Sequence, residues 1–337
     1  MKKRVLFIGP KFFNYEKYIC QELLNLGFEA DYFDERPGNS FLTKVLIRIN
    51  FQFLISLKIK FYYNKILKAT KNIEYSHVFI VSPETLNHRI LTQLRSENNS
   101  SKFILYMWDS FKNKNSIKLI PFFDRVLTFD DRDSNELNII FLPLFYTHPY
   151  QLIDKNPKEF PYDMCSFGTA HSDRYKITSQ VLRNVESLGL RVHAFHFLSH
   201  RILYWLRKFF IPKYNYGNIK DFSFRPLNPV QIINLVSLSR VILDVNHPEQ
   251  HGLTSRSIEA LGARRKLVTT NSNIKKYEFF NKNNIYIISR DNPEIDVVFF
   301  STPYVDIDEH VYNSYSLNSW LSDIFDDQFK GRQLNNF

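Results

Sequence analysis

The 337-residue sequence has only two cysteines, Cys20 and Cys165, and only nine glycines. The two cysteines lie far apart in separate apolar stretches, which excludes a disulfide framework and a cysteine-based zinc site. We interpret both as reduced core thiols. The scarcity of glycine, together with 44% hydrophobic residues, excludes a collagen-like, low-complexity or disordered chain. The sequence therefore predicts a folded protein, and its length favours two domains.

Long hydrophobic runs are also missing. No stretch offers the roughly 18 uncharged apolar residues that a membrane-spanning helix needs. The apolar run Val5–Ile8 is ended by Gly9-Pro10-Lys11 and is too short for the core of a signal peptide. We therefore expect a cytoplasmic protein. The loop at Gly9 also lacks the further glycines of the dinucleotide fingerprint, which disfavours a Rossmann oxidoreductase.

Short apolar runs alternate with helical spacing in both halves of the chain. Strands are predicted at 5–9, 28–33, 77–81, 103–107, 125–129, 139–142, 164–167, 191–197, 241–245, 266–270 and 285–288. Helices are predicted at 15–26, 173–188, 229–239 and 255–261. This alternation is typical of parallel sheets covered on both faces. It predicts an α/β protein with two Rossmann-like domains.

The domain boundaries follow from a segment with little periodicity. Residues 146–161 contain three prolines and mixed charges, as a linker would. We place the first domain at 1–155 and the second at 156–310. The remaining tail, 311–337, has helical spacing at Leu317, Trp320, Leu321 and Ile324, so it packs on the core or crosses back to the first domain.

The most informative stretch runs from Asp244 to Gly262 and places a polar loop between a strand and a short helix. Ligands bind at this edge of open α/β sheets, where Thr254 and Ser255 offer hydroxyls beside free backbone N–H groups. These features predict a diphosphate site. Arg256 lies in the first helical turn, where a cation meets the positive end of the helix dipole, and a bound anion would remove that conflict.

Glu259 follows one turn later, and its carboxylate can accept two hydrogen bonds from vicinal hydroxyls such as those of a ribose. An ordinary structural explanation stays open for this helix. Ser255 would then be a helix cap, and Arg256 and Glu259 would form a surface pair worth a few tenths of a kcal/mol.

Two further strand ends carry candidate residues. In Phe167–Ser172, Gly168 permits close backbone approach, and Arg174 at the start of the next helix could neutralise a phosphate. A plain tight turn is the alternative. Asp109, in Trp108-Asp109-Ser110, follows another strand and could take the proton from an acceptor hydroxyl. Capping of the next turn is the alternative role for Asp109.

Metal binding is not expected. Asp244, His247 and His251 share one loop but lack a regular ligand spacing. The segment Asp130–Asp133 contains a D-x-D pattern interrupted by arginine, which we interpret as a solvated loop.

Lysine and arginine outnumber aspartate and glutamate by 44 to 34, which favours an anionic partner. Two stretches combine cations with aromatic residues, and each is consistent with a core-covering helix or with an amphipathic helix in an anionic bilayer interface. In 41–70 the cations are Lys44, Arg48, Lys58, Lys60, Lys65 and Lys68, with no acidic residue. In 196–213, Arg201, Arg207, Lys208 and Lys213 accompany Tyr204, Trp205, Phe209 and Phe210.

A family resemblance rests on the second half. The segments Gly252–Arg256, Glu259–Gly262 and Lys266–Asn271 resemble the donor-binding segment of bacterial GT-B glycosyltransferases of the capsule and lipopolysaccharide biosynthesis type, a CgeB-like or group 1-like segment. The resemblance extends to Tyr106–Ser110, Phe167–Thr169 with Asp173 and Arg174, Phe224–Leu227 and the tail Tyr315–Phe325.

The resemblance implies two Rossmann-like domains facing each other across a cleft. The second would bind a nucleotide-sugar, and the first would bind a lipid-linked glycan acceptor at the cytoplasmic face of the inner membrane. Asp109 is the candidate catalytic base, and no cofactor or essential metal is expected. The candidate donor-binding residues are Gly168, Thr169, Arg174, His251, Gly252, Thr254, Ser255, Arg256 and Glu259.

Glu259 matches the acidic residue that binds the donor ribose in this fold class. Retaining families often carry a second glutamate eight positions earlier, where this chain has His251, and Glu249 lies two residues from that place. Two alternatives to a transferase remain: a catalytically silent GT-B-like sugar- or nucleotide-binding assembly protein, and a basic nucleic-acid-binding protein. The sequence lacks the signatures of common nucleic-acid-binding modules, so no nucleic-acid partner is expected.

Overall fold

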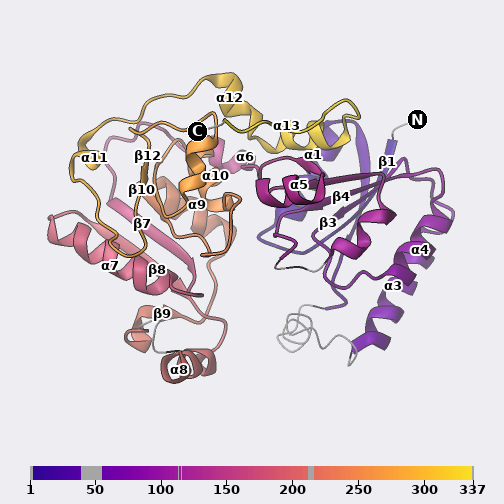
Figure 1. Ribbon diagram of the computed structural model, residues 1–337, viewed down its shortest axis with the longest axis horizontal. Coiled ribbons are helices and arrows are strands. Elements are labelled where there is room, and N and C mark those ends of the chain that lie inside the picture. The colour runs from indigo at the N-terminus through magenta and orange to yellow at the C-terminus, as the bar shows by residue number, and fades with distance from the viewer. Residues whose placement is uncertain (1–2, 39–54, 113, 115, 212–215, 336–337) are drawn as a thin grey trace. The chain divides into compact units, whose positions relative to one another are not determined.

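The protein consists of two compact units in a computed structural model that describes residues 3–38, 55–112, 114, 116–211 and 216–335 (Figure 1). Unit 1 comprises Met1–Pro143 and Asn318–Arg332, and unit 2 comprises Leu144–Leu317 and Gln333–Phe337. The sequence placed the division at 155. Each unit contains a six-stranded parallel sheet and the helices that connect its strands. Among the described residues, no helix has the length and apolar character needed to cross a bilayer.

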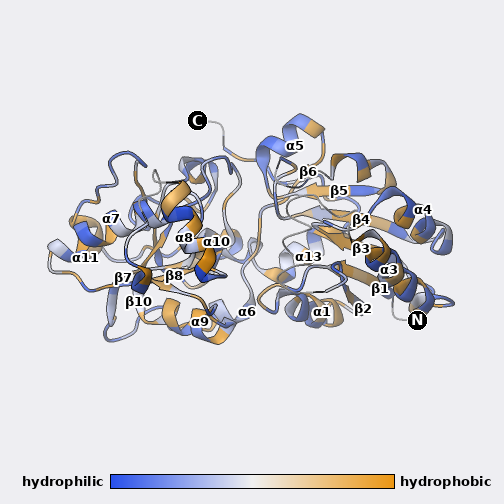
Figure 2. Ribbon diagram, turned by 90° about the horizontal axis from the view of Figure 1, so that it is seen from below, coloured by the Kyte–Doolittle hydropathy of each residue, from blue (hydrophilic) through white to orange (hydrophobic). Residues whose placement is uncertain are grey.

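The sheet of unit 1 has the strand order β2-β1-β3-β4-β5-β6. Its strands are β1 (Lys3–Gly9), β2 (Phe28–Asp34), β3 (His77–Val81), β4 (Lys102–Met107), β5 (Arg125–Thr128) and β6 (Ile140–Phe141). Its helices are α1 (Tyr15–Asn25), α3 (Ser56–Thr70), α4 (His88–Glu97) and α5 (Asp131–Leu137), with the 3-10 turn η2 (Ile117–Phe122). The central strands β1, β3 and β4 contain continuous apolar runs, as expected where helices cover a sheet, whereas the edge strand β2 includes Glu29 and Asp31. Figure 2 shows the strands of this sheet mostly in the hydrophobic colour.

The C-terminal tail completes unit 1. Its helix α13 (Leu317–Phe325) contributes Trp320, whose ring centroid lies 4.7 Å from that of Tyr106 and 6.0 Å from that of Phe79. Phe325 packs against Phe79 as well, at 5.7 Å. Of the two arrangements that the spacing of 311–337 left open, the structure therefore has the segment Asn318–Arg332 on the first unit, whereas Gln333–Phe337 belongs to unit 2.

Unit 2 has the strand order β12-β11-β10-β7-β8-β9. Its strands are β7 (Tyr162–Thr169), β8 (Val192–Phe197), β9 (Phe222–Ser223), β10 (Ser239–Asp244), β11 (Lys266–Thr269) and β12 (Ile285–Ile287). Its helices are α6 (His148–Gln151), α7 (Arg174–Ser187), α8 (Arg201–Phe210), α9 (Pro229–Ser237), α10 (Ser255–Gly262), α11 (Val298–Ser301) and α12 (Glu309–Ser314), with the 3-10 turns η4 (Ile219–Asp221) and η5 (Ser272–Lys276).

Three local expectations are wrong. Gly168 and Thr169 belong to β7 and not to the turn after it, because they pair with β8 at His196 and Phe197. The segment 146–161 contains the short helix α6 within unit 2. Asp130–Asp133 begins a helix instead of forming a solvated loop.

The acidic cluster at that helix has a structural explanation. Asp130 is the N-cap of α5, and its carboxylate accepts hydrogen bonds from the backbone N–H groups of Arg132 and Asp133. The Asp133 carboxylate in turn accepts from the N–H of Phe111 at 2.8 Å. Acidic side chains at a helix N-terminus satisfy its free donors and complement its dipole. The D-x-D pair, Asp131 and Asp133, therefore lies in the first turn of α5, directly after the cap Asp130.

Candidate functional site

The candidate donor site lies at the carboxyl edge of the unit 2 sheet. Because all strands are parallel, β7, β10, β11 and β12 end on the same edge, at Thr169, Asp244, Thr269 and Ile287. The loop between β10 and α10 begins there. This is the edge at which open α/β sheets bind ligands.

Asp244 organises the start of α10. One of its carboxylate oxygens, Oδ2, accepts hydrogen bonds from the hydroxyls of Thr254 at 2.5 Å and Ser257 at 2.9 Å. Thr254 is the N-cap, and its Oγ1 accepts from the N–H of Ser257 at 3.2 Å. The alternative in which Ser255 caps the helix is therefore wrong, since Ser255 is the first residue of α10.

The loop before α10 is held from the neighbouring strand. Asn271, just after β11, donates its amide N–H groups to the carbonyl oxygens of His251 at 3.1 Å and Gly252 at 3.3 Å. Gly252 is buried, whereas His251 is exposed with Nδ1 3.3 Å from the amide nitrogen of Asn273. The loop backbone is thus fixed by side chains that come after β11.

Arg256 and Glu259 form an ion pair, with 2.8 Å between Arg256 Nη1 and Glu259 Oε2. Their side chains are only 17% and 7% exposed, so the pair is not the solvent-exposed one of the structural alternative. The Arg256 guanidinium also lies over the ring of Phe167, 3.4 Å from its centroid. It is therefore fixed between α10 and β7.

Two further arginines converge on this edge. Arg174, at the start of α7, donates from Nε to the carbonyl oxygen of Val245 at 2.7 Å. Arg290, which follows β12, pairs with Asp173 at 2.9 Å and donates to the side-chain oxygen of Asn246 at 2.8 Å.

The electrostatics of Arg174 show how close these arginines lie. Burial lowers the pKa of Arg174. The Asp244 carboxylate opposes this effect, and the charges of Arg256 and Arg290 add to it. The Arg174 guanidinium therefore lies near enough to those of Arg256 and Arg290 to be repelled by both.

Donor groups of these arginines are left over. A guanidinium carries five N–H donors. Within the described part of the chain, Arg256 donates one hydrogen bond, to Glu259, and Arg174 donates from Nε to Val245 and from Nη1 to the Thr169 carbonyl. The remaining donors can bind an anion.

Two glycines of the predicted motifs serve packing. A Cβ at Gly168 would lie 3.2 Å from Nη1 of Arg174, so this glycine makes room for the guanidinium. A Cβ at Gly262 would lie 2.5 Å from the ring of Tyr146. Thr169, the last residue of β7, is exposed at the edge.

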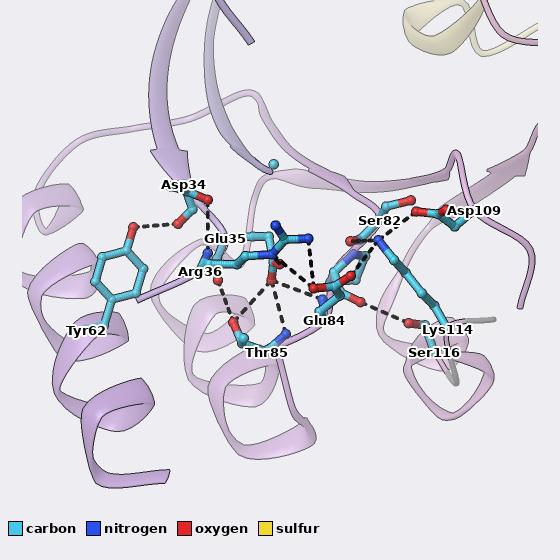
Figure 3. Close-up of polar contacts among 12 residues, drawn as sticks. Asp34, Glu35, Arg36, Tyr62, Ser82, Glu84, Thr85, Asp109, Lys114 and Ser116 are labelled. Carbon is cyan, nitrogen blue, oxygen red and sulfur yellow. Dashed lines mark hydrogen bonds and ion pairs between the residues drawn. The ribbon is translucent and has the colours of Figure 1, made fainter. Parts of the chain in front are cut away.

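The second candidate region lies in unit 1, at the carboxyl ends of β2, β3 and β4 (Figure 3). Lys114 places Nζ 2.7 Å from an Asp109 oxygen and 3.1 Å from a Glu84 oxygen. Arg36 pairs with the same Glu84 at 2.8 Å and with Glu35 at 3.2 Å. Asp109 is thus the end of an alternating chain of charges.

The charged side chains of this row are more deeply buried the farther they lie from Asp109. The Asp109 side chain is 42% exposed, whereas that of Glu35 is fully buried. Burial raises the pKa of Glu35, although backbone N–H groups of Glu84 and Thr85 donate to its carboxylate. Burial would lower the pKa of Lys114, but the carboxylates of Asp109 and Glu84 outweigh it and raise that pKa, which keeps the ammonium charged.

The comparisons with known proteins concern the fold. No protein-family model and no curated protein matches the chain. Among solved structures it is similar to Anabaena HepE in complex with UDP-glucose, with TM-score 0.60 and 8% identity over 95% of this chain and 98% of that one. It is also similar to the trehalose 6-phosphate synthase of Burkholderia multivorans, with TM-score 0.58 and 7% identity over 96% of each chain. The chain has the GT-B fold.

A glycosyltransferase from Rickettsia africae shares this fold, with TM-score 0.55 and 14% identity over 95% of this chain and 96% of that one. The α/β class and the two Rossmann-like units expected from the sequence are confirmed. The individual site residues stay predictions.

The structure gathers most of the predicted donor-site residues at one edge of unit 2. It adds Arg290, which the sequence analysis missed because a single cation after the last strand carries no local signal. Among the residues that the structure describes, no three His, Cys, Asp or Glu side chains are arranged to hold a metal ion. Asp244 is turned toward Thr254 and Ser257, and the ring of His247 lies 5.7 Å from that of His171.

Acid is expected to destabilise unit 2 through His196. Burial lowers the pKa of His196 to about 4, against roughly 6.5 in an unfolded chain. Because the unfolded chain takes up the proton first, this contribution to stability is present above pH 6.5 and is lost as the pH falls toward 4. The loss is about 1.4 kcal/mol at pH 5.5. Urea unfolding at pH 7.5 and 5.5 should show a smaller acid loss in His196→Phe, which keeps the ring contact with Tyr175.

The exposed His200 offers the matched control. His200→Gln should keep the full loss of stability between the two pH values. An unchanged acid loss in His196→Phe would contradict the assignment to His196.

Proposed function

We propose that this protein is a glycosyltransferase that moves a sugar from a nucleotide-sugar to a glycan acceptor. The observation that carries the proposal is the convergence of Arg174, Arg256 and Arg290 from three separate segments on one sheet edge. Glu259 and Asp173 pair with two of these arginines and hold them in place. The guanidinium N–H donors that these contacts leave over can make charge-assisted hydrogen bonds to a diphosphate. The GT-B fold, and the UDP-glucose held by the similar Anabaena structure, support a nucleotide-sugar as the ligand.

Each predicted donor residue has a role in this proposal. The three arginines, the backbone N–H groups at the start of α10 and the Ser255 hydroxyl bind the diphosphate. The Thr254 hydroxyl donates to Asp244 and caps α10, so Thr254 fixes the start of the helix and does not donate from its side chain to the ligand. Glu259 fixes Arg256 with one oxygen and accepts hydrogen bonds from ribose hydroxyls, since a carboxylate has about four acceptor sites. Gly168, Thr169, His251 and Gly252 shape the backbone around the nucleotide.

The reaction exchanges one bond at the anomeric carbon for another. The bond from that carbon to the diphosphate oxygen breaks, and the electron pair leaves on the nucleoside diphosphate. The acceptor hydroxyl forms the new bond, and its proton passes to Asp109. The arginines stabilise the charge that develops on the leaving group, a role that a metal ion takes in other transferases. We therefore propose that no cofactor and no essential metal takes part.

The acceptor is proposed to be a lipid-linked glycan of surface polysaccharide or lipopolysaccharide biosynthesis. This part rests on the sequence resemblance and on the net charge of +10, which suits an anionic surface. The protein would then work in the cytoplasm at the inner face of the membrane.

Nucleotide binding is the direct test. We expect one of UDP, GDP, CMP, ADP and dTDP to stabilise the wild-type protein against heat without added metal. Arg174→Met should weaken that binding about 10- to 100-fold, because a hydrogen bond to a charged group contributes about 1.5–3 kcal/mol. Calorimetric titration measures the difference.

Controls separate the site from the fold. Arg183→Met removes an exposed arginine from the same helix and should bind as the wild type does. Glu259→Gln should also weaken binding while preserving the shape of the side chain. Failure of all five nucleotides to bind would contradict the proposal, and binding without turnover of any sugar donor would leave a silent nucleotide-binding protein.

A further inference from the structure

Helix α8 has an apolar stripe that faces solvent. The stripe consists of large side chains that are 46 to 77% exposed: Ile202, Trp205, Leu206, Phe209 and Phe210. Their spacing of i, i+3, i+4, i+7 and i+8 places them within about 140° of the helix circumference. In a globular protein such a stripe normally faces the core. Here it is the opposite side that packs on unit 2.

The packing of that opposite side fixes the helix. Tyr204 is buried, donates from its hydroxyl to the carbonyl oxygen of Gly217 at 2.7 Å, and packs against Phe222 with 5.4 Å between ring centroids. Arg207 donates to the carbonyl oxygen of Ala170 and to the hydroxyl of Tyr216. Figure 1 shows α8 beside β9 at the margin of unit 2. The outward orientation of the stripe is therefore set by specific contacts.

The charged residues that flank α8 in the sequence are all positively charged. No aspartate or glutamate occurs between Glu186 and Asp221. The same interval contains six cations: Arg191, Arg201, Arg207, Lys208, Lys213 and Lys220. Arg201 and Lys208, on α8 itself, are exposed. An apolar stripe bordered by cations complements a partner that is apolar and anionic together.

We infer that α8 is the segment that binds an anionic phospholipid bilayer. It lies in the plane of the interface, with Trp205, Phe209 and Phe210 among the acyl chains and headgroups. Arg201 meets the lipid phosphates. Lys208 adds its positive charge from beside the stripe, where its ammonium donates to the Tyr204 hydroxyl and the Gly217 carbonyl oxygen. A second copy of the chain is a poorer occupant, because pairing two α8 helices would bring like charges together. None of the stripe residues belongs to the proposed donor site, so the inference holds whether or not the chain transfers sugar.

The other basic-aromatic stretch, residues 41–70, differs from α8 in the part that the structure describes. Residues 41–54, with Lys44 and Arg48, lie outside the described part of the chain. In α3, Ile59, Tyr63 and Ile66 are buried in the core of unit 1. Leu57 and Phe61 of α3 are 69% and 66% exposed. One face of α3 therefore covers the core and its outer face has two exposed apolar side chains, whereas α8 has five in one stripe.

Vesicle binding tests the inference. At low ionic strength the full chain should sediment with vesicles of phosphatidylglycerol and phosphatidylcholine, and at least ten times more weakly with phosphatidylcholine alone. Trp205→Ser/Phe209→Ser should reduce binding to the anionic vesicles at least tenfold. The matched control Leu152→Ser, which removes a lone exposed leucine, should bind as the wild type does.

A second readout locates the contact. The emission of Trp205 should shift to shorter wavelength when anionic vesicles are added, and Trp205→Phe should lose the shift while keeping vesicle binding. Both variants change exposed side chains, so an unchanged melting temperature is expected. Equal binding to both kinds of vesicle, undiminished binding of the double variant, or a concentration-dependent dimer that the double variant loses would overturn the inference.

Discussion

Replacing Asp109 with asparagine is expected to lower turnover about 10²- to 10⁴-fold, the contribution that general base catalysis typically makes. Asparagine has the same shape but cannot accept the proton of an acceptor hydroxyl. Nucleotide binding should be unchanged, because the residues proposed to bind the donor belong to unit 2. The expected signature is therefore a fall in kcat with an unaltered Kd for the nucleotide.

The contacts of Asp109 support its selection over other carboxylates of unit 1. It follows β4 at the sheet edge where ligands bind, and Lys114 holds one of its oxygens at 2.7 Å. Glu84 pairs with Lys114, and Arg36 pairs with Glu84 in turn; the side chains of Glu84 and Arg36 are only 14% and 13% exposed. The Asp109 carboxylate is therefore held in one orientation by Lys114 and is still 42% exposed to solvent. Such a carboxylate is accessible to an acceptor hydroxyl whose proton it could take.

Asp124 provides the matched control for this variant. It is also paired with an arginine, Arg95, at 2.6 Å, but it precedes β5 and so lies at the opposite edge of the sheet. Asp124→Asn should leave kcat nearly unchanged. Full activity of Asp109→Asn would refute the base assignment without touching the donor site, and equal losses in both variants would point to a general effect on unit 1.

The sequence predicts the framework well because buried parallel strands need continuous apolar runs. The strand His77–Val81 is found at the predicted bounds, and the predicted helix 255–261 is found as Ser255–Gly262. Strand ends are less certain, since pairing with a neighbour extends a strand into polar residues. Gly168 and Thr169 join β7 for this reason.

Tertiary placement limits the prediction of the site. The strand, loop and helix from Asp244 to Gly262 are contiguous, so their chemistry can be read from spacing. Arg290 reaches the same edge from a distant segment, and only the folded chain brings it to Asp173 and Asn246. Glu35 is a comparable case, because a charged residue after β2 resembles a solvated loop until Thr85 and Arg36 enclose it.

Trp320→Ala is expected to destabilise unit 1 by about 3–5 kcal/mol, the usual cost of truncating a large aromatic side chain in a core. Trp320 is 1% exposed and packs against Tyr106 and Phe79, which lie on two central strands. The chain returns to unit 1 only after it has built unit 2, so this side chain anchors the tail to the sheet. Unfolding in urea, followed by circular dichroism, measures the loss.

The position of Trp320 makes the effect selective. Two units with separate cores can unfold in separate transitions, and only that of unit 1 should move to lower urea concentration. Stabilisation of unit 2 by a nucleotide should persist in the variant. Ser322→Ala, on the exposed side of the same helix, should change the stability by less than about 0.5 kcal/mol. A loss below 1 kcal/mol in Trp320→Ala would mean that the tail contributes little to the core of unit 1, because a buried tryptophan that leaves a cavity cannot cost so little.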